Sequence, residues 1–182
     1  MAMNTAPHCC EDFWEERSAT PEAPYHYVGS GLPNVFLAGV KYRVCRKCGM
    51  QSADIPALKN LLASIATTVV NKASALTGAQ VRFLRKRLNR RSLDFAAMIS
   101  VTPQHLSKIE CQDEEKPLDP GRDKLIRVIY RALSGDRKLK DVLSKEVEFE
   151  QWIASIHGKG NGERIVATWL ANHQWRVEAE AA

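Results

Sequence analysis

The sequence predicts a mainly α fold: a helix-turn-helix bundle, preceded by a small β module and followed by a C-terminal helical extension. Two observations favour this class. Apolar residues recur at helical spacing from residue 58 onward, and capping residues mark successive helix starts between residues 77 and 103. We therefore divide the chain into a β module over residues 1–50, a connecting helix and linker over 51–75, the bundle over 76–133 and the extension over 134–182.

The positive charge of the chain is concentrated in one segment. The 182 residues include 26 Lys and Arg and 21 Asp and Glu, which gives a net charge of +5, and 45% are hydrophobic, a balance typical of an ordered protein. Residues 77–110 hold seven of the bases and two of the acids, so this segment carries the whole net charge. An anionic partner is therefore expected to bind there.

The composition excludes a membrane-spanning protein. The longest apolar stretch, Leu61–Val70, is interrupted by Ser64 and Thr67 and is shorter than the roughly 20 apolar residues that a spanning helix needs. The first residues are neither basic nor followed by an apolar run, so they do not form a secretory signal. We expect a soluble, cytoplasmic protein with no membrane partner.

The N-terminal residues predict a small β module. Residues 1–24 contain several prolines and are expected to be irregular. Short strands are predicted at Tyr25–Val28 and Val35–Leu37. A third strand, which leads into Cys45, is indicated by the alternation of Val40, Tyr42 and Val44 with Lys41 and Arg43.

The cysteines of this module favour a metal site. The chain has five cysteines, four of them within the first 48 residues, and in a reducing compartment such a cluster favours metal binding over disulfides. Two residues separate Cys45 from Cys48, so one zinc ion can bind both thiolates, and Gly49 permits the tight turn that this requires. Cys111 is predicted to take no part.

Two further ligands are needed for tetrahedral zinc, and His8, Cys9 and Cys10 are the nearest supply, with His26 less well placed. Either His8 with one adjacent cysteine or both cysteines could complete the set. We predict a structural Zn²⁺ ion in a zinc-ribbon-like module, with the ligands Cys9, Cys10, Cys45 and Cys48.

A connecting helix and the first bundle helix follow. Leu58, Leu61, Leu62, Ile65 and Val69 share one helical face, and Pro56 suits the first turn. The run Thr77-Gly78-Ala79-Gln80 has the spacing of a capping box. The helix that it starts buries Val81, Leu84 and Leu88, and its outer face carries Arg82, Arg85, Lys86 and Arg87.

The next two helices have the spacing of a helix-turn-helix. The second, capped by Ser92, is expected to bury Leu93, Ala96, Ala97 and Ile99, with the small Ala96 at the close helix crossing and Ser100 in the turn. Thr102 and Pro103 mark the start of the third helix, which buries Leu106 and Ile109. A fourth helix is predicted from Pro120 to Leu133, covering the motif with Leu125, Val128, Ile129 and Ala132.

The third helix has the properties of a DNA-reading helix. Its polar residues lie opposite Leu106 and Ile109, where they can enter a major groove. Gln104 can pair bidentately with adenine, and Lys108 with guanine or phosphate. Phosphate contacts are expected from the neighbouring arginines. The predicted DNA-binding residues are Thr102, Gln104, His105, Ser107, Lys108, Arg87, Arg90 and Arg91.

The last part of the chain is predicted to be helical over residues 138–157 and 163–171, with the glycine-rich turn at 158–162 between them. That turn lacks the lysine and hydroxyl ending of a phosphate-binding loop, so we interpret it as a connector.

Two segments resemble known families. The stretches LTGAQVRFLRKRL and DFAAMISVTPQHLSKIE make residues 76–133, about a third of the chain, similar to Cro/C1-type (Xre) DNA-binding domains, although Ser100 stands where glycine is usual. The run YHYVGSGLPNVFLAGVKYRVCRKCG resembles the YgiT-type zinc finger of MqsA-like antitoxins and related regulators. This resemblance implies that Cys45 and Cys48 are the second ligand pair, while residues 8–10 stand in place of the family's first CxxC.

These observations lead to two functional hypotheses. The first is a transcriptional regulator, a repressor that binds a palindromic operator in double-stranded DNA as a homodimer. The second is an antitoxin that binds a toxin protein through its N-terminal zinc module and regulates its own operon. An enzyme is not expected, because no nucleophile is paired with a base.

Overall fold

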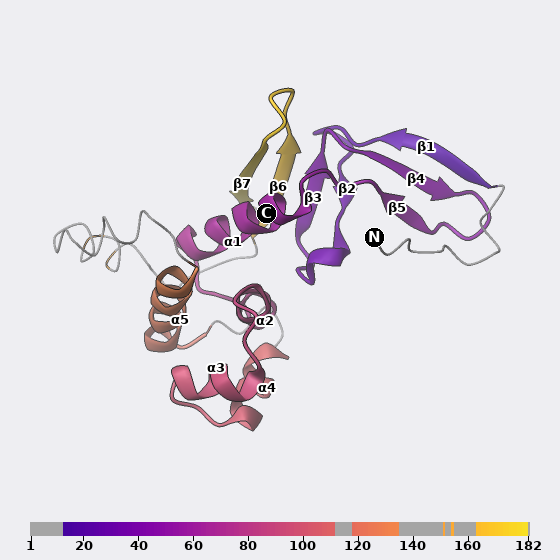
Figure 1. The fold of residues 1–182 in the computed structure, drawn as a ribbon. Helices are drawn as coiled ribbons and strands as arrows, with labels where there is room; N and C mark the ends of the chain where they lie inside the picture. The colour runs from indigo at the N-terminus through magenta and orange to yellow at the C-terminus, as the bar shows by residue number, and fades with distance from the viewer. Residues whose placement is uncertain (1–12, 112–117, 135–150, 152–153, 155–162, 182) are drawn as a thin grey trace.

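The computed structural model describes residues 13–111, 118–134, 151, 154 and 163–181. Within these residues the chain forms seven strands in two sheets and five α-helices (Figure 1). The predicted mainly α class is therefore wrong: strands form most of the regular structure before residue 54 and all of it from residue 163 onward, so the fold is α/β. None of the helices in this part of the chain is long and apolar enough to cross a membrane.

The first sheet is antiparallel, with the order β1 (Trp14–Ser18), β4 (Lys41–Cys45) and β5 (Gln51–Ala53). The alternating pattern before Cys45 predicted β4 correctly. By contrast, β1 lies within residues predicted to be irregular, because its sequence WEERS has no apolar alternation. Five residue pairs with β4, from Trp14 opposite Cys45 to Ser18 opposite Lys41, hold it in place. The partner strand, rather than local propensity, makes this segment extended.

The second sheet combines segments that are far apart in the sequence. The two predicted strands are confirmed as β2 (Tyr25–His26) and β3 (Val35–Ala38), and a short 3₁₀ turn (Val28–Ser30) follows β2. The remaining strands are β6 (Glu163–Trp169) and β7 (Trp175–Ala181), in the order β2-β3-β6-β7. β3 and β6 run parallel, whereas β6 and β7 form an antiparallel hairpin.

Strand β6 replaces the helix predicted over residues 163–171. Ile165 and Ala167 are 1% and 0% exposed, and Val166 between them is half-buried, which is the alternation of a strand. Its parallel pairing, from Val35 opposite Ile165 onward, joins residues with a large sequence separation, so local periodicity did not reveal it. The C-terminal extension is thus not helical over these residues. The helix predicted over 138–157 and the turn at 158–162 lie outside the described residues, apart from Gln151 and Ala154.

Helix α1 (Leu58–Asn71) confirms the predicted connecting helix, and Leu61, Ile65 and Val69 are fully buried. It packs against the β6–β7 hairpin and also contacts α2 and α5, so it lies between the second sheet and the bundle (Figure 1). Pro56 lies before the N-cap residue rather than in the first turn, and its carbonyl accepts a hydrogen bond from Trp175 Nε1 at 2.9 Å. This bond ties the hairpin to the start of α1.

The helix-turn-helix bundle contains α2 (Gly78–Arg87), α3 (Ser92–Met98), α4 (Pro103–Glu110) and α5 (Pro120–Leu133). The predicted capping box is present: Thr77 Oγ1 accepts from Gln80 N at 3.4 Å, and Gln80 Oε1 accepts from Thr77 N at 3.1 Å. Thr102 caps α4, with Pro103 at its first position. The predicted starts of α2 and α4 are therefore confirmed.

Helix α3 differs in detail from the prediction. Its N-cap residue is Arg91 rather than Ser92, and no side chain caps the helix. Leu93 is 62% exposed and Ala97 is also exposed, so Phe95, Ala96 and Ile99 form the buried contacts instead.

Helix α5 turns a different face to the protein than the sequence suggested. We predicted that Leu125, Val128, Ile129 and Ala132 cover the motif. In the structure Leu125 is 38% exposed, and the buried residues are Asp123, Ile126, Arg127 and Tyr130. The buried stripe contains two charged residues, and an assignment that follows apolar residues alone misses it.

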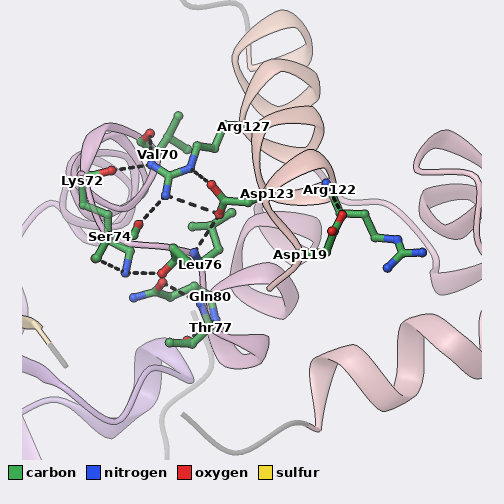
Figure 2. A network of polar contacts seen from close by, with 11 residues as sticks. Val70, Lys72, Ser74, Leu76, Thr77, Gln80, Asp119, Arg122, Asp123 and Arg127 are labelled. Carbon is green, nitrogen blue, oxygen red and sulfur yellow. Dashed lines mark hydrogen bonds and ion pairs between the residues drawn. The ribbon is translucent and has the colours of Figure 1, made fainter. Parts of the chain in front are cut away.

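Those two charges form a buried network between α5 and the segment that links α1 to α2 (Figure 2). Arg127 Nε donates to Asp123 Oδ2 at 3.0 Å, and its terminal nitrogens donate to the carbonyls of Val70, Lys72 and Ser74 at 2.5–2.9 Å. Asp123 Oδ1 also accepts from Leu76 N at 2.7 Å. The ion pair thus satisfies backbone groups that the linker itself leaves unpaired.

Replacing Arg127 by methionine should lower the free energy of unfolding by about 3–5 kcal/mol, because Asp123 keeps a buried charge and loses its partner. Urea unfolding followed by circular dichroism measures the change. Lys59→Met on the exposed surface of α1 is the control and should cost no more than about 0.5 kcal/mol. Equal losses in the two variants would contradict the role given to this network.

Candidate nucleic-acid interface

Helix α4 presents a polar face to solvent. Leu106 and Ile109 are 0% and 4% exposed and anchor the helix in the bundle. The residues predicted to read DNA lie on the other side and are exposed: Gln104, His105, Ser107 and Lys108. Thr102 Oγ1 accepts from His105 N at 3.1 Å, which fixes the first turn of the helix. This surface is free of other described elements and can enter a groove of about 12 Å, the width of the major groove.

The turn between α3 and α4 sets the angle of this face. Ser100 adopts the left-handed conformation, with φ 55°, where a non-glycine residue is strained. Two backbone hydrogen bonds hold it, from Ser100 N to Ala97 O at 3.2 Å and from Val101 N to Ala96 O at 3.0 Å. Ala96 itself is fully buried, as expected for a residue at a close helix crossing. Ser100 therefore holds, under backbone constraint, a left-handed conformation that a glycine would adopt without strain.

An ion pair connects α4 to α2. Arg85 Nε and Nη2 donate to Glu110 Oε1 and Oε2 at 2.5 and 2.7 Å, and Nη1 donates to Arg90 O at 3.1 Å. The hydrogen bonds that Arg85 donates to the Glu110 carboxylate are the main reason why the pKa of Arg85 is raised. One guanidinium thus fixes the end of α4 and the loop after α2 together.

This pair was missed by sequence reasoning, which put Arg85 on the outer face. In fact the side chains of Arg85 and Glu110 are only 12% and 8% exposed. One feature of the sequence could have indicated their burial. Arg85 directly follows the buried Leu84, and Glu110 directly follows the buried Ile109.

The three arginines predicted to contact phosphates fall into two groups. Arg91 is exposed and forms an ion pair with Asp94 at 3.1 Å in the first turn of α3. Arg90 is exposed, whereas Arg87 is half-buried, and both line a pocket of about 590 Å³ with residues of α1 and α5. None of the described residues that line this pocket comes from α4.

The predicted metal ligands are described only in part. Cys45 is 1% exposed at the end of β4, and Cys48 lies at the surface in the turn that follows. Gly49, with φ 72°, donates its N–H to Cys45 O at 2.8 Å, and Cys45 N donates to Met50 O at 2.8 Å. This closed turn is the backbone geometry that a two-thiolate zinc knuckle needs.

The other predicted ligands, Cys9 and Cys10, lie outside the described residues, as does His8. Within the described ranges no group of three or more metal-binding side chains occurs. Arg46 N donates to Phe13 O at 2.8 Å, so the chain just after these residues runs beside the Cys45–Cys48 turn. His26 has a structural partner, since Nε2 donates to Pro33 O at 2.6 Å.

No protein-family model, curated protein or solved structure matches this chain. The functional argument therefore depends on the residues and geometry described above.

Replacing Arg85 by methionine should lower the free energy of unfolding by about 3 kcal/mol, because Glu110 would lose the partner of a nearly buried charge. Thermal or urea unfolding of the full chain gives the value. The matched control is Arg91→Met, which breaks the exposed pair with Asp94 and should cost at most about 1 kcal/mol. If both variants lost the same stability, the Arg85–Glu110 pair would not be what fixes α4.

Proposed function

We propose that this protein is a cytoplasmic, sequence-specific DNA-binding transcriptional regulator, a repressor that inserts α4 into the major groove. The observation that carries the proposal is the exposed polar face of α4, a capped helix that ends the segment holding the whole net positive charge of the chain. A helix that merely faces water needs neither the strained turn at Ser100 nor the concentration of positive charge in residues 77–110. Their combination therefore favours a nucleic-acid interface over a simple solvated surface.

The residues of α4 have distinct proposed roles. Gln104, in the first turn, is suited to bidentate pairing with adenine, and Lys108 to guanine or phosphate. His105 and Ser107 lie on the same exposed face and are suited to base edges or sugar-phosphate oxygens. Thr102 is exposed at the N-terminus of α4, where backbone N–H groups favour a phosphate.

Phosphate contacts on the flank of the groove are assigned to Arg90 and Arg91. Both are exposed and lie directly before α3, and Arg85, which pairs with Glu110 at the end of α4, also donates to Arg90 O. Arg87 was part of the predicted set, but its half-buried position in the pocket between α1 and α5 favours another role.

Binding as a homodimer follows from the half-site logic of helix-turn-helix proteins, whose two recognition helices lie about 34–36 Å apart on a palindrome. Two apolar regions are candidate dimer surfaces from the sequence: the stripe Leu58–Val69 of α1, and the region of Trp169 and Trp175 together with Trp152, which lies outside the described residues. Leu61, Ile65 and Val69 of that stripe are already buried within the chain, so the proposed dimer must use another surface.

A structural zinc ion is part of this proposal. The closed Cys45–Cys48 turn supplies two thiolates, and Cys10 precedes Phe13 by only three residues, a length of chain that can span about 10 Å. Bound zinc would join the start of β1 to the end of β4, and its contribution would be to folding, not to chemistry.

The antitoxin hypothesis remains the second candidate, because the N-terminal module carries three exposed large apolar side chains. Phe13, Val28 and Met50 are 47%, 66% and 40% exposed, and a partner protein could cover them. A stable complex between this chain and the product of an adjacent toxin-like gene, lost on changing Phe13 to serine, would favour this function. It is compatible with autoregulation through α4.

Changing Gln104 to alanine should abolish preference for the operator while leaving nonspecific binding, a loss of about 1–3 kcal/mol of discrimination. Arg91→Ala should instead weaken binding to all sequences and make the salt dependence shallower by about one unit of slope. Fluorescence anisotropy with the protein's own upstream DNA, at several salt concentrations, measures both effects.

The control is Lys59→Ala, because Lys59 is an exposed residue in the first turn of α1 and does not belong to α4. This variant should bind DNA as the unmodified chain does. Binding without any salt dependence would rule out the proposed interface, since phosphate contacts release counterions.

Freshly purified protein should contain one zinc ion per chain, and Cys48→Ser should lose most of it because one thiolate ligand is removed. Inductively coupled plasma mass spectrometry measures the content. Cys111→Ser, a change at the exposed end of α4, should retain full occupancy. Less than one zinc per several chains in the unmodified protein, or full occupancy in Cys48→Ser, would refute the site.

A further inference from the structure

A pocket of about 590 Å³ lies where α1, α2 and α5 meet. These three helices contact one another on the side of α1 away from the first sheet (Figure 1). The volume falls within the range of roughly 300–1,000 Å³ that is typical of small-molecule sites. Arg87 and Arg90 of its lining were predicted to contact DNA phosphates, but the reading helix α4 supplies none of the described lining.

The charged lining of the pocket has one sign. Arg87 comes from the end of α2, Arg90 from the loop after it and Arg131 from α5, and no Asp or Glu is among the described lining residues. The side chains of Arg87, Arg90 and Arg131 are therefore three cations that approach one space from three chain segments.

The ends of the helices do not neutralise these cations. α1 ends at Asn71, α2 at Arg87 and α5 at Leu133, so three helix C-termini lie at the pocket. Each carries a partial charge of about −0.5, which together offsets about half of the charge of three guanidinium groups. The pocket keeps a net positive charge that an anionic ligand would balance.

One of the guanidinium groups has unused hydrogen-bonding capacity. Arg87 Nε is buried and finds no hydrogen-bond partner among the described residues. Buried polar groups in native proteins are nearly always paired, because an unpaired donor costs free energy. Arg131 is held differently, since Nη2 donates to Asn71 Oδ1 on the facing helix. The pocket thus has one arginine, Arg131, that is fixed to the facing helix, and one, Arg87, whose Nε is paired with none of the described residues.

The remaining lining is mixed: Thr67, Asn71 and Ser134 are polar, and the other residues are apolar or aromatic. Ala63 and Val70 come from α1, Leu88 follows α2, and Leu133 ends α5, where its side chain is 44% exposed. Tyr130 adds an aromatic ring. A ligand that suits both sides of the pocket has a charged end and an apolar or aromatic portion.

We propose that this pocket binds a small phosphate monoester that carries an apolar or aromatic group. Phosphate is favoured over carboxylate because its terminal oxygens point in three directions and accept from three arginines at once, whereas the two oxygens of a carboxylate lie in one plane. The phosphate meets Arg87, Arg90 and Arg131, and the apolar group meets Leu88 and Leu133. Arg90 is also one of the arginines assigned to DNA phosphates, so the ligand binds the free protein, and α4 takes no part in the site.

Isothermal titration calorimetry on the full chain tests this inference with phenyl phosphate as the probe and sodium chloride at matched ionic strength as the reference. Phenyl phosphate should bind at a single site, and more tightly than inorganic phosphate or benzoate, each of which reproduces only one half of the ligand. Arg87→Gln and Arg131→Gln should each weaken binding at least tenfold, a loss expected for a charge-assisted bidentate contact.

Arg82→Gln is the matched control, since Arg82 is exposed on α2 and does not line the pocket. It should bind phenyl phosphate as the unmodified chain does, and circular dichroism checks that every variant is folded. Benzoate binding as tightly as phenyl phosphate would overturn the phosphate assignment. An equal loss in Arg82→Gln, or no binding to the unmodified chain, would overturn the site itself, and neither result depends on whether α4 binds DNA.

Discussion

The buried pair of Arg127 and Asp123 is the constraint on which the arrangement of the molecule depends. A single guanidinium accepts no hydrogen bond but donates to the carboxylate on its own helix and to three carbonyls between residues 70 and 74. That short linker joins α1, which packs on the second sheet, to α2, which opens the bundle. A hydrophobic contact could bury as much surface, but it has no preferred direction. A guanidinium has several N–H donors in fixed directions, so it can hold the carbonyls of residues 70–74 in one conformation. The direction in which α4 faces follows from that path.

The sequence predicted the bundle well where the signals are local. Capping at Thr77 and Thr102, the proline at position 103 and the small Ala96 each act within a few residues, and each lies where expected. The exposed face of α4 followed from the same short-range pattern, since Leu106 and Ile109 alone determine which side is buried. The polar candidate residues of α4 could therefore be predicted before any three-dimensional information.

What could not be predicted depends on partners that are distant in the sequence. The helical spacing of apolar residues near Ile165 is equally compatible with a strand, and only pairing with β3 decides between them. Arg85 was expected outside because a single charge is costly to bury, yet it pairs with Glu110 of α4, and Asp123 is buried where it accepts from Leu76 N, 47 residues earlier, as well as from Arg127 of its own helix. The pocket lined by Arg87 and Arg131 likewise exists only once α2 and α5 meet.

The parallel contact between β3 and β6 also has a consequence for how the chain is made. Everything from residue 58 to residue 133, including the whole bundle, is synthesised between these two neighbouring strands. During translation the helices can fold while the outer edge of β3 still lacks a neighbour, because its partner has not left the ribosome. An unpaired strand edge is a template for association with other chains. A chain that stopped after the bundle would keep α4 and expose that edge, so the last hairpin protects the protein from aggregation as well as completing a sheet.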